Sequence, residues 1–157
     1  MSKLSKTLKA ITILLSLLLT AGSTLIAYDA QRLASSGVEF IPPPPGERIG
    51  DYVVFNVSIR IKNTGYFFDI YDVNITILVI DEEGNRHAKD SKVHPELKLG
   101  ESALLTLTLK IPATVIDEWN AGNIELYWKL IFKFWFGKYG YKLIMFGIAG
   151  KGSLRGE

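Results

Sequence analysis

Residues 52–62 read YVVFNVSIRIK, and this stretch decides the fold class. Its apolar side chains fall on every second position, at Val53, Phe55, Val57, Ile59 and Ile61. Successive side chains of a β-strand point to opposite faces, so the alternation predicts a strand with one buried side and one solvent-facing side. The residues at positions 63–65, Asn-Thr-Gly, predict a turn at the end of this strand.

The same alternation recurs along the rest of the chain, in segments separated by short turns. It predicts further strands at residues 72–81, 86–93, 103–111 and 141–149. The second of these is polar, and its lysines are typical of an edge strand. A turn is expected at residues 95–102, and a short helix at residues 113–119 that ends before Gly122.

Residues 123–136, NIELYWKLIFKFWF, fit two periods. Glu125, Lys129 and Lys133 are spaced by four and would form one stripe of a helix. The same three residues also share one face of a strand with Tyr127 and Trp135. The many aromatic and branched side chains, and the glycine-containing turn that follows, favour the strand. A second membrane span is not expected, because two lysines would lie in hydrocarbon.

These segments together are typical of an antiparallel, immunoglobulin-like β-sandwich, expected over residues 51–150 and followed by a flexible tail at residues 151–157. A chain of 157 residues fits one such domain with an anchor. Cysteine is absent, which excludes disulfides and cysteine-ligated zinc.

Upstream of the strands, residues 10–28 read AITILLSLLLTAGSTLIAY and carry no charge. At about 1.5 Å per residue, a helix of this length reaches roughly 28 Å, close to the roughly 30 Å hydrocarbon core of a bilayer. Lysines precede the segment within residues 1–9, and by the positive-inside rule they place that flank in the cytoplasm. The sequence therefore predicts a single-pass protein of the cell membrane, with the β domain outside and the lipid bilayer as the partner of residues 10–28.

A cleaved signal peptide is the alternative to this transmembrane signal anchor. Ala21 and Ser23 resemble a cleavage site, but the apolar run exceeds the roughly 7–15 residues of a typical signal core, which favours an uncleaved anchor. Residues 29–50 are expected to extend the helix as far as Gly37 and then to form a linker. The four prolines at residues 42–45 predict a polyproline spacer that holds the domain off the membrane. A ligand for an SH3-type module is the alternative for these prolines.

The formal net charge of +2 resides in the N-terminal flank, since removing the three lysines of residues 1–9 leaves −1. The exterior domain therefore offers no basic face, and no nucleic-acid partner is expected.

Residues 59–84 and 95–112 resemble the LEA14-like (water stress and hypersensitive response type) sandwich, in versions anchored to archaeal membranes by one N-terminal helix. Two turns carry the resemblance: an Asn-Thr/Pro-Gly turn matched by Asn63 and Gly65, and a Pro-Gly-Glu-like turn matched by Leu99, Gly100 and Glu101. The resemblance covers residues 52–149. It implies a non-enzymatic binding or structural module, with no catalytic residues or cofactor to transfer.

Two asparagines lie in N-glycosylation sequons, Asn56 in Asn-Val-Ser and Asn74 in Asn-Ile-Thr. Both are expected on the polar faces of their strands and outside the cell, so both are candidate glycosylation sites. The alternative is chance, because Asn followed two residues later by Ser or Thr is common in solvent-facing strands.

Other candidate chemistry is weak, and we expect no enzyme and no metal site. His87 and His94 lack a third zinc ligand. Residues 81–83, Asp-Glu-Glu, lack the spacing of a calcium loop. Asp69 and Asp72 have no evident nucleophile beside them.

Three aromatic residues, Tyr127, Trp135 and Tyr139, are expected to remain outside the core. They form a candidate interaction patch for a protein partner or for the lipid headgroup region. The sequence thus leaves two functional hypotheses. The first is an anchored module with an interaction or envelope-structural role, acting with a membrane or envelope protein. The second is a secreted filament or surface-layer subunit in which a freed strand, residues 38–41, pairs with a neighbouring copy.

Overall fold

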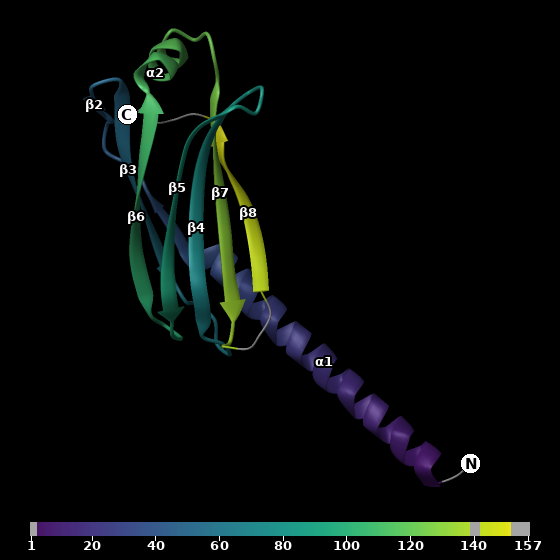
Figure 1. Cartoon of the computed structure of the whole chain (residues 1–157). Coiled ribbons are helices and arrows are strands. Elements are labelled where there is room, and N and C mark those ends of the chain that lie inside the picture. The colour runs from purple at the N-terminus through teal and green to yellow at the C-terminus, as the bar shows by residue number, and fades with distance from the viewer. Residues whose placement is uncertain (1–2, 139–141, 152–157) are drawn as a thin grey trace.

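A computed structural model describes the backbone of residues 3–138 and 142–151 and the side-chain surroundings of residues 11–138. It contains one long N-terminal helix, two antiparallel sheets of four strands each and a short helix at one end of the sandwich (Figure 1). In chain order the elements are α1 (Lys3–Ser36), β1 (Val38–Ile41), β2 (Glu47–Ile49), β3 (Tyr52–Lys62), β4 (Ile70–Asp81), β5 (Arg86–Leu97), β6 (Ser102–Pro112), α2 (Ala113–Asn120), β7 (Leu126–Phe136) and β8 (Lys142–Lys151). The predicted fold class, an antiparallel β-sandwich after one apolar helix, is confirmed.

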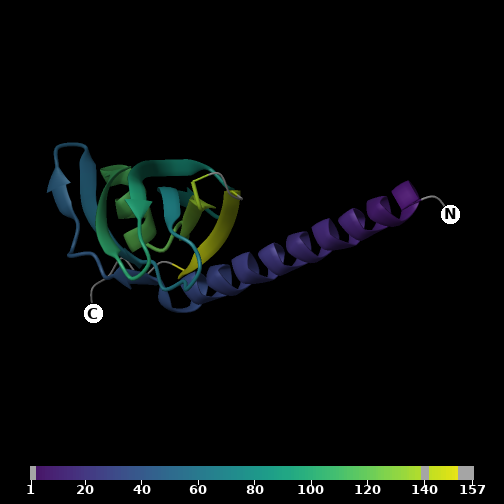
Figure 2. The same cartoon turned by 90° about the horizontal axis from the view of Figure 1, so that it is seen from below.

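In the first sheet, β3 pairs with β6 on one side and with β1 and β2 on the other. The second sheet has the order β5-β4-β7-β8, so β5 is an edge strand, as predicted. β5 and β6 run side by side where the two sheets meet (Figures 1 and 2). There the Asp90 carboxylate accepts a hydrogen bond from the Thr108 N–H at 2.7 Å, which links the two edges.

Alternating burial fills the space between the sheets. β3 buries the five apolar residues that the sequence pattern selects, and Ile59 is fully buried. β7 is a strand rather than a helix, since Phe132, Phe134 and Phe136 are buried while Lys133 points outward. The strand forms despite the helical spacing of the charged residues, because the alternation places the aromatic side chains in the core.

The turn predicted from residue 95 starts too early, because β5 continues to Leu97. Pro95 has no N–H to donate, and the structure places it where none is needed. In the pairing of β4 with β5, Tyr71 faces Glu96 and Val73 faces His94, which leaves Pro95 beside the unpaired Asp72. Proline is tolerated at such a position in an edge strand.

The spacer expected within residues 29–50 is corrected by the structure. β1 pairs with the C-terminal half of β3, from Val38↔Ile61 to Ile41↔Ser58, and β2 pairs with the N-terminal end of the same strand. The prolines at residues 42–45 connect these two short strands along one side of β3. They interrupt the hydrogen-bonded ladder because they lack N–H donors. Residues 38–49 therefore belong to the sandwich.

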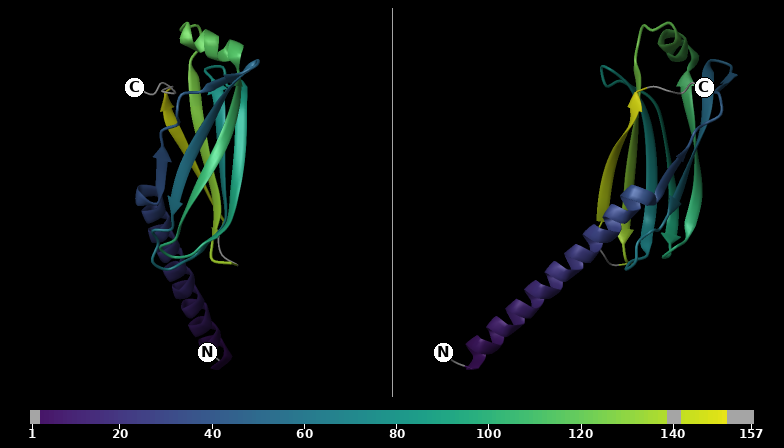
Figure 3. Two further views of the ribbon diagram at one scale, coloured as in Figure 1. Left: turned by 90° about the vertical axis from the view of Figure 1, so that its left-hand side faces the viewer. Right: turned by 180° about the vertical axis from the view of Figure 1, so that it is seen from behind.

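α1 is one uninterrupted helix with two different surroundings (Figure 3). Its N-terminal half projects away from the sandwich, and its leucine and isoleucine side chains there are about half exposed or more. Its C-terminal turns lie against the sandwich, where Ile26, Ala30 and the buried Leu33 pack on the core. Residues 11–36 form a helix long and apolar enough to cross a membrane, although a signal sequence fits the same criterion.

Candidate functional site

The polar group that links α1 to the sandwich is the Asp29 carboxylate, which is fully buried. Its Oδ1 accepts a hydrogen bond from the Tyr66 N–H at 2.9 Å. Its Oδ2 accepts hydrogen bonds from the N–H groups of Phe67 at 2.9 Å and Phe68 at 3.1 Å. Hydrogen bonds to an ionised acceptor are stronger than those between neutral groups, so three converging amides compensate the burial of this carboxylate. They join α1 to the loop between β3 and β4, residues 63–69, which we call the junction loop.

Asn63 shapes the junction loop from within. It is buried, and its Oδ1 accepts the Gly65 N–H at 3.1 Å. Its Nδ2 donates to the carbonyl oxygens of Phe68 at 3.0 Å and Leu97 at 3.1 Å. The predicted turn at residues 63–65 is thus confirmed. It exposes the following amides toward Asp29.

Position 65 requires glycine because the surrounding atoms leave no room for a side chain. A Cβ at this position would lie 2.7 Å from Asp29 Oδ2 and 3.1 Å from Asn63 Oδ1. Any side chain would therefore push the junction loop away from the carboxylate that holds it.

Arg32, one turn further along α1, makes a second set of contacts with the junction loop. Its Nε donates to the Thr64 carbonyl oxygen at 2.9 Å, and its Nη1 donates to the Tyr66 hydroxyl oxygen at 2.7 Å. Its guanidinium also lies 4.2 Å from the centre of the Tyr66 ring, within the range of a cation–π contact. Asp29 therefore holds the loop through three of its amides, and Arg32 holds it through the Thr64 carbonyl and the Tyr66 side chain.

Three rings form an exposed cluster at this junction: Tyr28 of α1 and Tyr66 and Phe67 of the junction loop. Their centroids lie 6.2–6.4 Å apart, and the three residues are 46%, 59% and 48% exposed, respectively. We call this cluster the aromatic trio. The next residue, Phe68, turns inward and packs edge-on against Phe136.

The two turns behind the LEA14-like resemblance lie against each other. The Asn63 N–H donates to the Glu101 carbonyl oxygen at 2.9 Å, and the Gly100 N–H donates to the Asn63 carbonyl oxygen at 2.9 Å. Both turns thus lie at the end of the sandwich opposite α2 (Figure 1).

A cleft of about 260 Å³ lies on the second sheet, and we call it the outer cleft. Its lining residues come from β4, β5 and β7: Asp72, Asn74, Val93, Lys133, Phe134 and Trp135. Asp72 has a φ of 50°, in the left-handed region that is uncommon for a residue other than glycine. The register between β4 and β7 shifts at this residue. The irregularity brings a carboxylate, an amide, an ammonium group and an indole to one cleft.

The predicted aromatic patch is not assembled as one surface. Tyr127 and Trp135 share the outer face of β7, but eight residues of strand separate them, roughly 26 Å. Trp135 lines the outer cleft, whereas the Tyr127 hydroxyl donates to Glu125 at 2.6 Å. Tyr139 lies outside the described residues, as do residues 152–157 of the predicted tail.

Both sequon asparagines lie in strands, with unequal exposure. Asn56 is exposed on β3, and its Oδ1 accepts a hydrogen bond from the Thr108 hydroxyl at 2.9 Å. Asn74 is half-buried in β4, between two neighbouring strands, and its Oδ1 accepts a hydrogen bond from the Ser91 hydroxyl at 3.1 Å. Asn56 is therefore the more accessible acceptor for a glycan.

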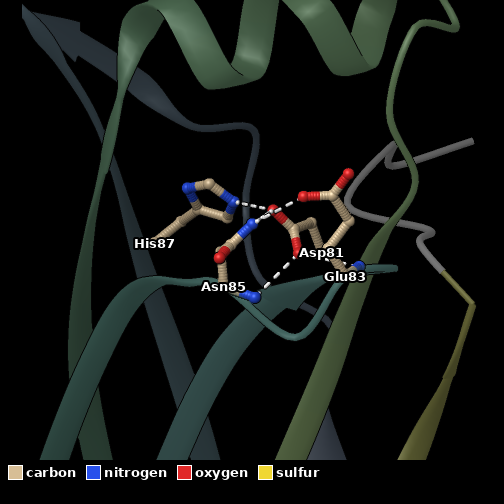
Figure 4. Close-up of polar contacts among 4 residues, drawn as sticks. All are labelled: Asp81, Glu83, Asn85 and His87. Atoms are coloured by element: carbon tan, nitrogen blue, oxygen red, sulfur yellow. Dashed lines mark hydrogen bonds and ion pairs between the residues drawn. The ribbon is translucent and has the colours of Figure 1, made fainter.

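A second buried carboxylate, Asp81, closes the hairpin between β4 and β5 (Figure 4). Its Oδ1 accepts the N–H groups of Glu83 at 3.0 Å and Asn85 at 2.8 Å. Its Oδ2 lies 2.9 Å from both Asn85 Nδ2 and His87 Nε2. Burial alone would raise the pKa of Asp81, but the hydrogen bonds from Asn85 and His87 outweigh it and lower this pKa to about 2.

The remaining candidate residues serve as turn and strand groups. Asp69 Oδ1 accepts the Leu99 N–H at 2.9 Å. His87 and His94 are both on β5, and seven residues of strand separate them by roughly 23 Å. Within the described part of the chain, no three histidine, aspartate or glutamate side chains are placed to hold a metal ion.

No family model matches this chain, and no curated protein matches it. Among solved structures, a protein from Archaeoglobus fulgidus is 11% identical, with 76% of this chain and 98% of that chain covered and a TM-score of 0.47. A protein assigned as ApaA from Bordetella pertussis is 15% identical, with 73% and 88% covered and a TM-score of 0.48. A β-glucuronidase of glycoside hydrolase family 2 is 14% identical over 74% of this chain but only 13% of the enzyme, with a TM-score of 0.41. At these sequence identities and TM-scores, the similarities do not indicate a function for this chain.

Proposed function

We propose that this chain is a single-pass membrane protein that presents its β-sandwich on the extracytoplasmic side, as a non-catalytic interaction or envelope-structural module. The observation that carries the proposal is the division of α1. One half exposes apolar side chains suited to lipid, and the other half is bound into the sandwich through Asp29 and Leu33. A helix that is apolar on all sides is suited to a bilayer rather than to water.

The orientation follows from the charges beside the apolar segment. Three lysines precede it within residues 1–9, and they favour the cytoplasmic side. At the other end, Asp29 and Arg32 are engaged by the junction loop, so the helix leaves the hydrocarbon near Tyr28. The sandwich then lies outside the cell.

The resemblance to LEA14-like sandwiches supports a binding or structural role over catalysis. The contact between its two characteristic turns, through Asn63, Gly100 and Glu101, is consistent with that resemblance. The outer cleft, with Asp72, Lys133 and other polar groups beside Trp135, offers a surface for a partner in the membrane or envelope.

The secreted filament subunit remains the second candidate. Its donor strand would be residues 38–41, but here that strand pairs with β3 of its own chain. Assembly by strand exchange would first have to break this ladder. Cleavage near Ser23, however, would leave Asp29 and Leu33 in place, so a processed chain could keep the same sandwich.

The decisive experiment is the intact mass of the protein from cells that express the full chain, combined with protease treatment of those cells from outside. A full-length mass in the membrane fraction and digestion of the sandwich by external protease are expected. A mass lacking the first twenty or so residues would replace the proposal with the secreted subunit. A full-length, membrane-bound protein protected from external protease would reverse the topology.

A further inference from the structure

We infer that the aromatic trio, Tyr28, Tyr66 and Phe67, lies in the headgroup region of the outer leaflet, so that the sandwich rests directly on the bilayer. This inference rests on the proposed function, since it requires α1 to span the membrane. It adds a second membrane contact, made by a loop far from the span in sequence.

The depth of the trio follows from the junction. The uncharged segment of α1 ends at Tyr28, which therefore lies at the edge of the hydrocarbon core. Asp29 follows at once, and its carboxylate holds the amides of Tyr66 and Phe67 within 2.9 Å. The junction loop therefore cannot lie at a different depth from the end of the span.

The chemistry of the trio suits that depth. Tyrosine combines an apolar ring with a polar hydroxyl, and such side chains are enriched at the boundary between hydrocarbon and water. Phe67 is 48% exposed, whereas the residue after it, Phe68, is partly buried and packs against the core. Arg32, which donates to the Tyr66 hydroxyl, adds a cation beside the rings at the level of the lipid phosphates.

The connection between α1 and β1 is too short and too tightly packed for the sandwich to move away from the membrane surface. The Gly37 N–H donates to the Leu33 carbonyl oxygen at 2.8 Å, and the Lys62 N–H donates to the Gly37 carbonyl oxygen at 2.7 Å. A Cβ at Gly37 would lie 2.5–2.7 Å from Leu33 and Lys62 atoms, so the backbone passes tightly between helix and strand. The prolines come after β1 and cannot act as a spacer.

The chain has no cysteine, so single cysteines can carry a nitroxide label for depth measurements. The full chain, with Leu17→Cys, Phe67→Cys or Tyr52→Cys, would be placed in vesicles of phosphatidylcholine and phosphatidylglycerol. Collision rates with oxygen and with a water-soluble nickel chelate give the depth of each label. Tyr52 is the matched control, since it is an exposed aromatic residue at the opposite end of β3, roughly 34 Å from the junction.

We expect the label at position 17 in hydrocarbon, the label at 52 in water and the label at 67 within roughly 5–7 Å of the hydrocarbon boundary. A label at 67 that behaves like the one at 52, while position 17 stays in hydrocarbon, would overturn the inference and leave the proposed function standing. A label at 17 in water would refute the proposed function itself. Spin–spin broadening at 67 that disappears on dilution in lipid would assign the trio to a contact between copies, and would also overturn the inference.

A second set of variants carries the label outside the trio, so that the rings themselves can be kept or replaced. Leu99 is exposed on the turn that contacts the junction loop, so Leu99→Cys reports on the same end of the sandwich. Adding Tyr66→Ser and Phe67→Ser should raise the nickel collision rate at position 99, because the end of the domain loses its lipid contact. An unchanged rate would contradict a role of the rings in seating the domain.

Discussion

Two buried aspartates collect hydrogen bonds in the same way but over different lengths of chain. Asp81 binds groups two to six residues away, within one hairpin. Asp29 binds the amides of Tyr66, Phe67 and Phe68, which are 37–39 residues away. The first carboxylate shapes a turn, and the second joins a helix to a sandwich. The comparison indicates that distance along the chain, more than bond number, decides how much of the molecule depends on one side chain.

The largest effect is expected from Asp29→Ala. Three partly buried N–H groups would lose their acceptor, and partial access of water should limit the loss to about 3 kcal/mol in the free energy of unfolding. Denaturant unfolding of the full chain in detergent, followed by tryptophan fluorescence, measures this loss, and hydrogen exchange of residues 66–68 locates it. Asp51→Asn, at an exposed aspartate, is the control. Unchanged protection of those amides would show that Asp29 does not hold the loop.

Gly65→Ala tests the same junction from the other side. The added methyl would lie 2.7 Å from Asp29 Oδ2, so the loop must shift, at a cost of about 1–3 kcal/mol. Gly22→Ala in α1 is the matched control, because its Cβ would meet nothing within 4 Å and alanine favours a helix. Equal stability of the two variants would contradict the tight approach of loop and carboxylate.

Asp81→Asn should have a local effect that depends on pH. The pKa of Asp81 is lowered to about 2 in the folded protein by hydrogen bonds from Asn85 and His87, which outweigh the opposing effect of burial. A lowered pKa stabilises the fold above the ordinary value of 3.8, and this stabilisation is lost as the pH falls through about 2. Thermal unfolding between pH 5 and pH 2 should therefore be less steeply pH-dependent in the variant. Identical pH profiles would exclude a stabilising role of the ionised carboxylate.

The smallest effect is expected from Thr64→Val. Among the described residues, the structure gives the buried Thr64 hydroxyl no hydrogen-bond partner. Replacing it with a methyl group of similar shape should raise the free energy of unfolding by less than about 1 kcal/mol. A clear loss of stability, measured as for Asp29→Ala, would indicate that a water molecule or lipid group satisfies this hydroxyl.

The sandwich itself was largely predictable, because burial of one sheet face imposes alternation on β3, β4, β6 and β7. Pattern alone could not place β1 and β2, since the prolines between them also fit an extended spacer. It also ended β5 at Val93, ahead of Pro95, because the unpaired Asp72 that accommodates the proline lies on another strand. These errors arise where pairing between distant segments overrides a local signal.

The junction was the least predictable part. Asp29 and Arg32 follow an apolar segment and are explained equally well as its charged flank. Their partners, the Tyr66 amide and the Thr64 carbonyl, are backbone groups, which every residue type carries apart from the N–H that proline lacks. The sequence therefore cannot identify them as partners. Only the Asn63–Gly65 turn gave a signal, and it indicated a turn without indicating what the turn binds.

Because α1 continues without interruption into its docked turns, the sandwich also has a fixed rotation about the helix axis. Each residue of an α-helix turns by about 100° and rises by about 1.5 Å. Because Asp29, Arg32 and Leu33 fix the phase of the docked turns, the outer cleft faces one fixed azimuth relative to the side chains of the span. A partner in the same membrane must approach α1 from a matching side, and one residue inserted before Tyr28 would turn the whole domain away from it.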